Sequence, residues 1–368
     1  MNFKLNRRGF LKAGAATLAA GLAMPALIGR AHAAGVVNIV GHDSYVPKDL
    51  REKFTQETGI VINLRSTTDQ SQIFNLLAAE GDQRQTDMSI IAGHRMFAYI
   101  ATDYLAEIDE SKLPGMSKIN PVYRDADAQF IQGKRYGIPV LTGFAMMASR
   151  KGVVAPEDTE TWETIFGDKY AGRVTLRPGS ALYAAMFHLG LQDVWTGYNG
   201  DSAAVEAMLK ECREYAISRK HVLRKWYDTT AEFQQLYFGN EIDAGMGFTE
   251  TAMLLAGADS SVQPGIPVEG TTGWTYNYSL FKNSANQENT YKFIDFLLQQ
   301  ESIGSSMTRS SGSLSTFLDA TSGLTEAEAQ AIQFSDEQLQ RITWLDVKGA
   351  DDNRYGLLDQ YGAGLREA

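Results

Sequence analysis

The chain has 368 residues, of which 44% are apolar and 21% are charged, a composition typical of a globular protein with room for two domains of ordinary size. The formal net charge of −10 disfavours nucleic acid and anionic membrane surfaces as partners. A single cysteine, Cys212, excludes an internal disulfide and cysteine-rich zinc sites.

The first 33 residues have the parts of an export signal. Arg7 and Arg8, in the pattern RRGFLK, stand before a weakly apolar run that ends in the small-residue motif AHA. Paired arginines in this pattern are typical of twin-arginine signals, which route folded proteins across a bacterial inner membrane. The alternatives are a general secretory signal and a membrane anchor, and Pro25 disfavours the anchor. We expect a mature protein that begins near Ala34 and lies free in the periplasm.

From Val36 onward, short apolar strands alternate with amphipathic helices. The strands are expected at 36–41, 60–64 and 87–93, and the helices at 47–58, 70–81 and 94–105. This order predicts a parallel sheet covered by helices, with the loops that follow the strands at one edge. Three such loops, 41–45, 65–68 and 92–95, are rich in polar and aromatic residues. Ligands bind at this edge in open α/β sheets, so we expect these loops to face a ligand.

A second α/β block follows the first. Strand 137–150 runs out of the first block, and further strands are expected at 174–176, 241–248 and 271–282. The helices are expected at 181–195, 201–226, 249–258 and 291–307, and the last ~50 residues as mixed helix and loop. Cys212 lies on an apolar helical stripe with Val205, Met208 and Leu209, which favours a buried cysteine over an active-site thiol.

Six segments, in chain order between about residues 37 and 305, resemble periplasmic substrate-binding proteins of ABC importers, specifically the spermidine/putrescine-binding branch. They read YVPKDLREKFTQETGI, DMSIIAG, LAEIDESKL, YGIPVLTG, TWETIF with DKYAGRV, and GWTYNYSLFKNSANQENTYKFIDFLLQQE. The resemblance implies an α/β, type II periplasmic binding protein fold, with two lobes hinged by strands that cross near 142–146 and 274–278. The lobes would close on a small polar solute and deliver it to an ABC permease at the inner membrane.

The resemblance also implies domain boundaries and partners. Lobe 1 would comprise 34–143 and about 277–318, and lobe 2 would comprise 144–276 and about 319–368, after a signal peptide at 1–33. We expect a monomer that uses no cofactor and is not an enzyme. The sequence contains no G-x-S-x-G, H-E-x-x-H or Walker motif, although a folded-exported periplasmic enzyme stays open as an alternative. A role in presenting the solute to a chemoreceptor is equally compatible with the resemblance.

Candidate ligand residues occupy the positions at which the family binds its solute. Tyr45 and Trp274 keep the family's aromatic walls. Carboxylates are usual in the second-lobe loop and at the hinge, but this chain has Arg177 and Tyr276 there. We therefore expect weak binding of spermidine and putrescine, and a better ligand that is smaller or less cationic and carries a carboxylate for Arg177. The other candidates are His42, Asp43, His94, Phe248 and Glu250.

Each main candidate has a structural alternative. Trp274 could pack in the core, Tyr45 could lie on Pro47 at the surface, and Arg177 could form an ion pair between the lobes. Asp43 could be a turn residue, and Glu250 a first-turn helix acid. Tyr276 and Tyr278 share a strand face and could belong to a half-buried hinge.

Two histidines leave a metal site open as an alternative. His42 and His94, in two loops at the same sheet edge, could form a ferric site with Tyr276 and Tyr278, because related importers bind iron in that way. No short spacing supports such a site, and hydrogen-bonding loop histidines are the alternative. His188 and His221 fall in predicted helices and are assigned structural roles.

Overall fold

The first three strands of the protein form a parallel sheet, as the alternating sequence pattern predicts. The computed structural model describes residues 35–67, 70–81, 84–346, 348 and 352–368, so the predicted signal peptide lies outside the described residues. β1 (Gly35–Gly41) pairs in parallel with both β2 (Ile60–Ser66) and β3 (Met88–Ala92). The helices of this block are α2 (Lys48–Thr58), α3 (Gln70–Glu80) and α4 (Met96–Ala101).

The turn after α2 shows why this block folds as predicted. Gly59 ends the helix with a φ of 74°, the left-handed conformation that glycine adopts without steric cost. Phe54 is buried, and Leu50, four residues earlier on the same face, packs against the same core cluster. The helix therefore lies on the sheet, and the chain turns directly into β2.

A second block is built around β7 (Val174–Leu176), β8 (Leu223–Trp226) and β9 (Ala244–Phe248), in which β7 pairs in parallel with the other two. The longer helices of this block are α8 (Pro178–His188), α10 (Ser202–Arg219), α11 (Thr230–Phe238) and α12 (Thr249–Ala258). The middle of the chain also contains three short helices, α5 (Pro121–Arg124), α6 (Pro156–Thr159) and α7 (Glu163–Phe166). The strands β4 (Phe130–Ile131) and β5 (Lys134–Arg135) form a hairpin, and β10 (Val262–Gly265) is a further short strand.

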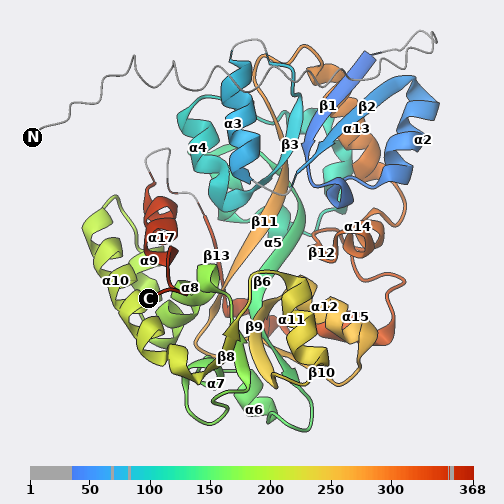
Figure 1. The fold of residues 1–368 in the computed structure, drawn as a ribbon. Helices are drawn as coiled ribbons and strands as arrows, with labels where there is room; N and C mark the ends of the chain where they lie inside the picture. Colours follow the sequence, from blue (N-terminus) through green and yellow to red (C-terminus); the bar gives the residue numbers. More distant parts are fainter. Residues whose placement is uncertain (1–34, 68–69, 82–83, 347, 349–351) are drawn as a thin grey trace, which may run out of the picture. The chain divides into compact units, whose positions relative to one another are not determined.

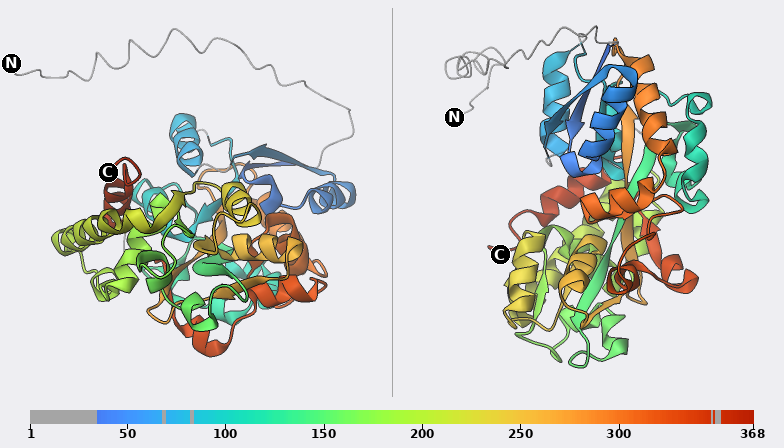
Figure 2. Two further views of the ribbon diagram at one scale, coloured as in Figure 1. Left: turned by 60° about the horizontal axis from the view of Figure 1, so that its bottom comes forward. Right: turned by 90° about the vertical axis from the view of Figure 1, so that its right-hand side faces the viewer.

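Two long strands belong to both blocks. β6 (Ile138–Arg150) pairs with β11 (Thr271–Leu280) through one half and with β9 through the other, while β11 also pairs with β3. The sheet order is β2-β1-β3-β11-β6-β9-β7-β8. Figures 1 and 2 show these strands running between the two groups of elements. The predicted crossings near 142–146 and 274–278 are confirmed.

Four predicted helices are wrong in extent. The helix expected at 94–105 is shorter, because a 3-10 turn occupies Gly93–Arg95 and α4 ends at Ala101. The helix expected at 181–195 is divided, because Gly190 has a φ of 70° between α8 and α9 (Gln192–Thr196). The helix expected at 201–226 ends at Arg219, and the residues from Leu223 form β8.

The helix expected at 291–307 is two helices, α13 (Gln287–Gln299) and α14 (Ile303–Ser311), separated by Ser302 in the left-handed conformation. The remaining elements are β12 (Leu314–Ser315), α15 (Glu326–Ile332), α16 (Asp336–Gln340), β13 (Ile342–Trp344) and α17 (Arg354–Gly362).

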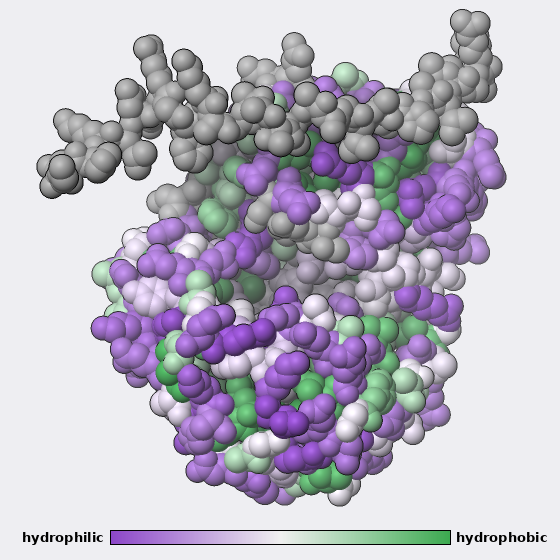
Figure 3. All heavy atoms as spheres, in the orientation of Figure 1, coloured by the Kyte–Doolittle hydropathy of each residue, from purple (hydrophilic) through white to green (hydrophobic). Residues whose placement is uncertain are grey.

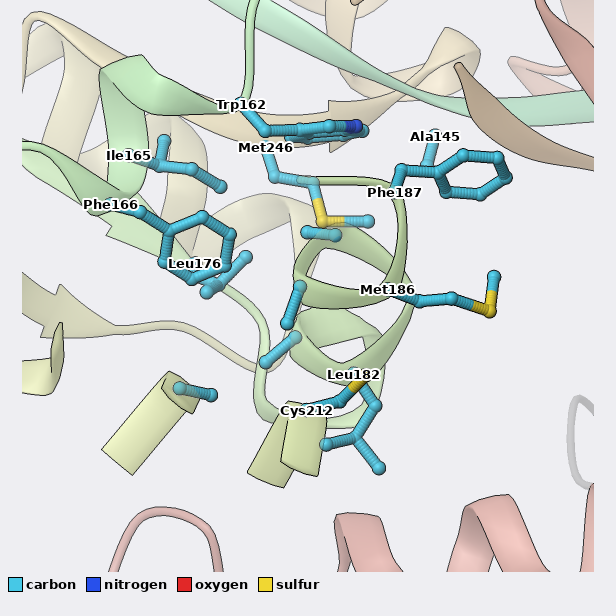
Figure 4. Close-up of a cluster of buried hydrophobic side chains, with 14 of the residues drawn as sticks. Ala145, Trp162, Ile165, Phe166, Leu176, Leu182, Met186, Phe187, Cys212 and Met246 are labelled. Carbon is cyan, nitrogen blue, oxygen red and sulfur yellow. The ribbon is translucent and has the colours of Figure 1, made fainter. Parts of the chain in front are cut away.

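Cys212 lies in the main core of the second block. Figure 4 shows it beside Leu182, below the rings of Trp162 and Phe166. It is 0% exposed, and burial raises the pKa of its thiol to about 12, so the predicted structural role is confirmed. The face of the molecule in Figure 3 is largely hydrophilic, with apolar residues scattered between polar ones. Among the described helices, none has the length and apolar character needed to cross a bilayer.

Candidate functional site

A cavity of about 880 Å³ lies where the loops after the first three strands meet the second block. Its size falls within the range of ~300–1,000 Å³ typical of small-molecule sites. The crossing strands β6 and β11 also contribute to its wall. The predicted site residues that line the cavity are His42, Tyr45, His94, Arg177, Phe248, Glu250, Trp274 and Tyr276.

Asp43 is the one predicted site residue that is not part of the lining. Its side chain is 63% exposed, and its carboxylate accepts a hydrogen bond of 3.0 Å from the backbone N–H of Ser44. Asp43 therefore acts as a turn residue, which was the structural alternative to a ligand contact. The sequence pattern placed Asp43 in the correct loop, but the short 3-10 turn at Asp43–Tyr45 directs the carboxylate to solvent.

Aromatic rings from two loops and a crossing strand form one wall. The rings of Tyr45 and Tyr276 lie 5.1 Å apart between centroids, and the rings of His42 and Tyr45 lie 4.9 Å apart. Phe248 meets Trp274 edge to face at 5.3 Å. These separations suit favourable aromatic pairs, so the wall is well packed before any solute binds.

Tyr276 and Tyr278 have different roles, although both pack on the same core cluster. Tyr276 lines the cavity, whereas Tyr278 is 1% exposed and is not part of the lining. The hydroxyl of Tyr278 donates a hydrogen bond of 2.7 Å to the backbone carbonyl of Tyr45. Tyr278 therefore holds the first loop in position rather than facing a solute.

Glu250 brings a partly buried carboxylate to the cavity from the first turn of α12. Burial raises its pKa, while the nearby charges of His42 and Arg177 act in the opposite direction. The hydroxyl of Thr230 lies 3.5 Å from one carboxylate oxygen. No ion pair among the described residues includes Glu250. Glu250 is thus both an acidic residue in the first turn of a helix and a residue of the cavity lining.

Arg177 brings a positive charge to the same cavity. It stands at the N-terminal end of α8 with an exposed side chain, and its guanidinium carbon lies 5.6 Å from the centre of the Phe248 ring. Among the described residues it forms no ion pair, so the proposed role as a bridge between the lobes is not seen. The cavity therefore presents both a carboxylate and a guanidinium, neither of which is ion-paired within the described part of the chain.

His94 lines the cavity beside the C-terminal helix α17. Its ring is 5.4 Å from that of Tyr355, and its buried Nδ1 has no hydrogen-bond partner within the described part of the chain. Burial and the adjacent Arg95 lower its pKa to about 3, so the imidazole is neutral at neutral pH. No cluster of three or more histidine, cysteine or acidic side chains suited to a metal occurs among the described residues.

The sequence analysis missed one charged pair in the cavity wall. Arg95 donates two hydrogen bonds, of 2.7 and 3.1 Å, to the carboxylate of Asp359 in α17. Arg95 follows His94 in a loop that was already expected to face a ligand, so the sequence pattern could have predicted Arg95 as a lining residue. The pattern could not have predicted Asp359, because it comes from a C-terminal region without a family motif. Other missed lining residues are Thr67, Thr230, Tyr183, Ser313, Tyr355 and Leu358.

Comparisons with known proteins agree with this geometry. The family model for bacterial extracellular solute-binding proteins matches residues 49–331. The spermidine/putrescine-binding periplasmic protein 1 of Haemophilus influenzae is 22% identical over 308 residues, which cover 83% of this chain and 82% of that protein.

Solved structures share the fold. A putative spermidine/putrescine ABC transporter protein from Listeria monocytogenes superposes with a TM-score of 0.70 at 17% identity, covering 90% of this chain and 98% of that one. The Atu4243–GABA receptor structure gives a TM-score of 0.67 at 16% identity, with 90% and 98% covered. The predicted type II periplasmic binding protein fold is confirmed. Because the matched family covers most of the sequence, and both blocks meet at one cavity, the chain belongs to the bacterial extracellular solute-binding proteins.

Proposed function

We propose that this protein binds a small solute with one amine and one anionic group, and delivers it to an ABC permease at the inner membrane. Membership of the solute-binding family supports the transport role. The observation that carries the ligand class is that Glu250 and Arg177 line one cavity and that neither forms an ion pair with another described residue. An ω-amino acid satisfies both charges, whereas a diamine satisfies only one.

The charges of the lining explain the preference. Its described carboxylates belong to Glu250 and Asp359, and Asp359 is already paired with Arg95. One carboxylate is thus left for an ammonium group. The second ammonium of putrescine would find no further unpaired carboxylate on the described lining and would share the cavity with the positive charge of Arg177. A charged group buried without its partner costs about 2–5 kcal/mol, and each 1.4 kcal/mol is tenfold in affinity.

The aromatic wall suits the amine end of such a solute. An ammonium group over the face of Trp274 or Tyr45 gains about 0.5–2 kcal/mol, depending on how fully it is desolvated. Glu250 influences the pKa values of Tyr45 and Tyr276, so its charge lies near this wall. The low pKa of His94 keeps that ring uncharged and unable to repel an amine. The relatives named for spermidine and putrescine indicate amine chemistry in the branch, and Glu250 retains one amine anchor.

The identity of the bound solute can be tested directly. Protein purified from its native host without denaturation should release an amine-bearing, carboxylate-bearing compound when it is analysed by mass spectrometry. A thermal-shift screen should then rank ω-amino acids above polyamines and above ferric citrate. Recovery of a polyamine, or of iron in stoichiometric amount, would contradict the proposed ligand class.

The cellular setting completes the proposal. The protein is exported by the twin-arginine route, matures near Ala34 and acts in the periplasm as a monomer without a cofactor or catalytic activity. Its lobes are 34–143 with about 277–318, and 144–276 with about 319–368. The RRGFLK pattern supports the export route, and the two strands β6 and β11, which pair with strands of both blocks, support these boundaries.

A further inference from the structure

The C-terminal segment supplies part of the cavity wall although it lies outside the family match, which ends at residue 331. Four of its side chains line the cavity: Leu345, Tyr355, Leu358 and Asp359. The family model therefore does not describe this part of the cavity wall.

Helix α17 is fixed to the second block. Arg213 of α10 donates hydrogen bonds of 2.5 and 2.8 Å to the carbonyls of Tyr361 and Ala363. At the other end of α17, the fully buried Arg354 donates a hydrogen bond of 2.7 Å to the backbone carbonyl of Trp195 in α9. Figure 1 shows α17 beside α10. The helix must move with the second block, because arginine-to-carbonyl hydrogen bonds at both of its ends hold it to α9 and α10.

The opposite side of α17 contacts the first block. Asp359 accepts two hydrogen bonds from Arg95, which follows β3. The ring of Tyr355 lies 5.4 Å from His94 and 6.1 Å from Phe97 of α4. All three contacts come from residues 94–97 of the first block. They cross the space between the blocks at the cavity, where a hinge motion would separate them.

We propose that the Arg95–Asp359 ion pair is a latch that holds the two blocks together in the absence of solute. A bidentate arginine–carboxylate pair has a fixed geometry, which favours one relative position of the blocks. The apparent affinity for a solute depends on the fraction of molecules already in the binding-competent state. The latch therefore tunes affinity without contacting the solute, and it acts whatever the ligand class is.

The latch can be tested in protein without solute. The only cysteine is buried, so spin labels can be attached through Glu57→Cys in α2 and Lys210→Cys in α10, both exposed. In this labelled protein, Asp359→Asn should lengthen or broaden the measured label-to-label distance, and salt should do the same. Asp228→Asn is the matched control. It removes another exposed Arg–Asp pair of the C-terminal segment, Arg366–Asp228, which lies within the second block. The control should leave the distance unchanged.

Two further measurements test the latch: exchange of the two charges, and the affinity of the variants for the solute. The double variant Arg95→Asp with Asp359→Arg should restore the distance that either single change disturbs. Asp359→Asn should weaken solute binding by roughly two- to fivefold, the range of a partly exposed ion pair. Circular dichroism establishes that each variant is folded. An unchanged distance in folded Asp359→Asn would overturn the latch. So would a loss of affinity that follows Arg95→Gln but not Asp359→Asn, because Arg95 would then bind the solute itself.

Discussion

The indole of Trp274 lies across Gly143 on the neighbouring strand, where the two residues are paired in the register of β6 and β11. A Cβ atom at position 143 would stand 3.0 Å from Cζ2 of the indole and 3.3 Å from the hydroxyl of Thr249. Glycine at this point lets the aromatic wall lie against the crossing strands. The position of the stacking surface is thus set by a residue that has no side chain.

Gly143→Ala should therefore displace the indole and weaken solute binding, with a loss of stability of about 1 kcal/mol from overpacking. Calorimetry and thermal unfolding measure the two effects. Gly257→Ala in α12 is the matched control, because its added Cβ meets only ordinary contacts at 3.6 Å or more. The control should bind solute normally. Equal affinity of both variants and the unchanged protein for the solute would contradict the claim that Gly143 sets the position of the Trp274 indole.

Glu250→Gln should have opposite effects on binding and on stability. Loss of the carboxylate should weaken binding of an amine by roughly 30-fold or more, because the ammonium then lacks its partner. Burial raises the pKa of Glu250 in the folded protein, so the unfolded chain gives up that proton at lower pH. The ionised carboxylate then opposes folding once the pH has risen through both pKa values. At neutral pH, the melting temperature of the solute-free variant should be higher than that of the unchanged protein.

The same shift predicts the pH dependence of binding. As the pH falls through the raised pKa of Glu250, the carboxylate is protonated and amine affinity should decline. Calorimetry across acidic pH should show this decline in the unchanged protein and a smaller decline in Glu250→Gln, in which the carboxylate of the solute still titrates. A decline of equal size in the variant would assign the titration to another group.

Trp274 provides an optical signal for binding. It is the one tryptophan among the described lining residues, while Trp162 and Trp195 are buried in the core. A solute that stacks on it should change the intrinsic fluorescence on binding. Trp274→Phe should abolish most of this change and lower the affinity for the solute. A full fluorescence response in this variant would show that the solute binds elsewhere.

Export can be tested apart from the binding site. Replacement of both Arg7 and Arg8 by lysine should leave precursor in the cytoplasm, because the twin-arginine route requires the paired arginines. Lys4→Arg is the matched control and should be exported normally. Normal periplasmic yield from the double variant would refute twin-arginine routing.

The sequence predicted best those features that depend on local pattern. The alternation of strands and helices in the first block and the glycine stop at position 59 follow from periodicity and turn chemistry, whereas the crossings of the two long strands were implied by the family resemblance. The helix predicted at 201–226 was too long because the apolar stripe continues past Arg219, where a 3-10 turn leads into β8. Periodicity alone does not show that residues at the end of a predicted helix will instead pair with a neighbouring strand.

Eight of the predicted site residues line the candidate cavity, some within the segments that resemble the family and others in loops at the ends of strands. Tyr45 and Trp274 occupy recognisable positions, and both reach the cavity. The pairing of Arg95 with Asp359 joins residues 264 positions apart, and no local pattern links them. Asp43 lies in a loop that reaches the cavity, but its own side chain does not line the cavity. The direction of a side chain in a tight turn depends on backbone angles that the sequence does not specify.

The most direct test of the proposed function is calorimetry with ω-amino acids and diamines of matched chain length, which differ only in whether the second end is a carboxylate or an ammonium. We predict that the ω-amino acid of the best length binds at least roughly 30-fold tighter than its diamine. Arg177→Ala should reduce this preference by weakening the amino acid and sparing the diamine. Submicromolar binding of putrescine or spermidine that survives Arg177→Ala would contradict the account, because it would mean that other acidic groups hold the second amine.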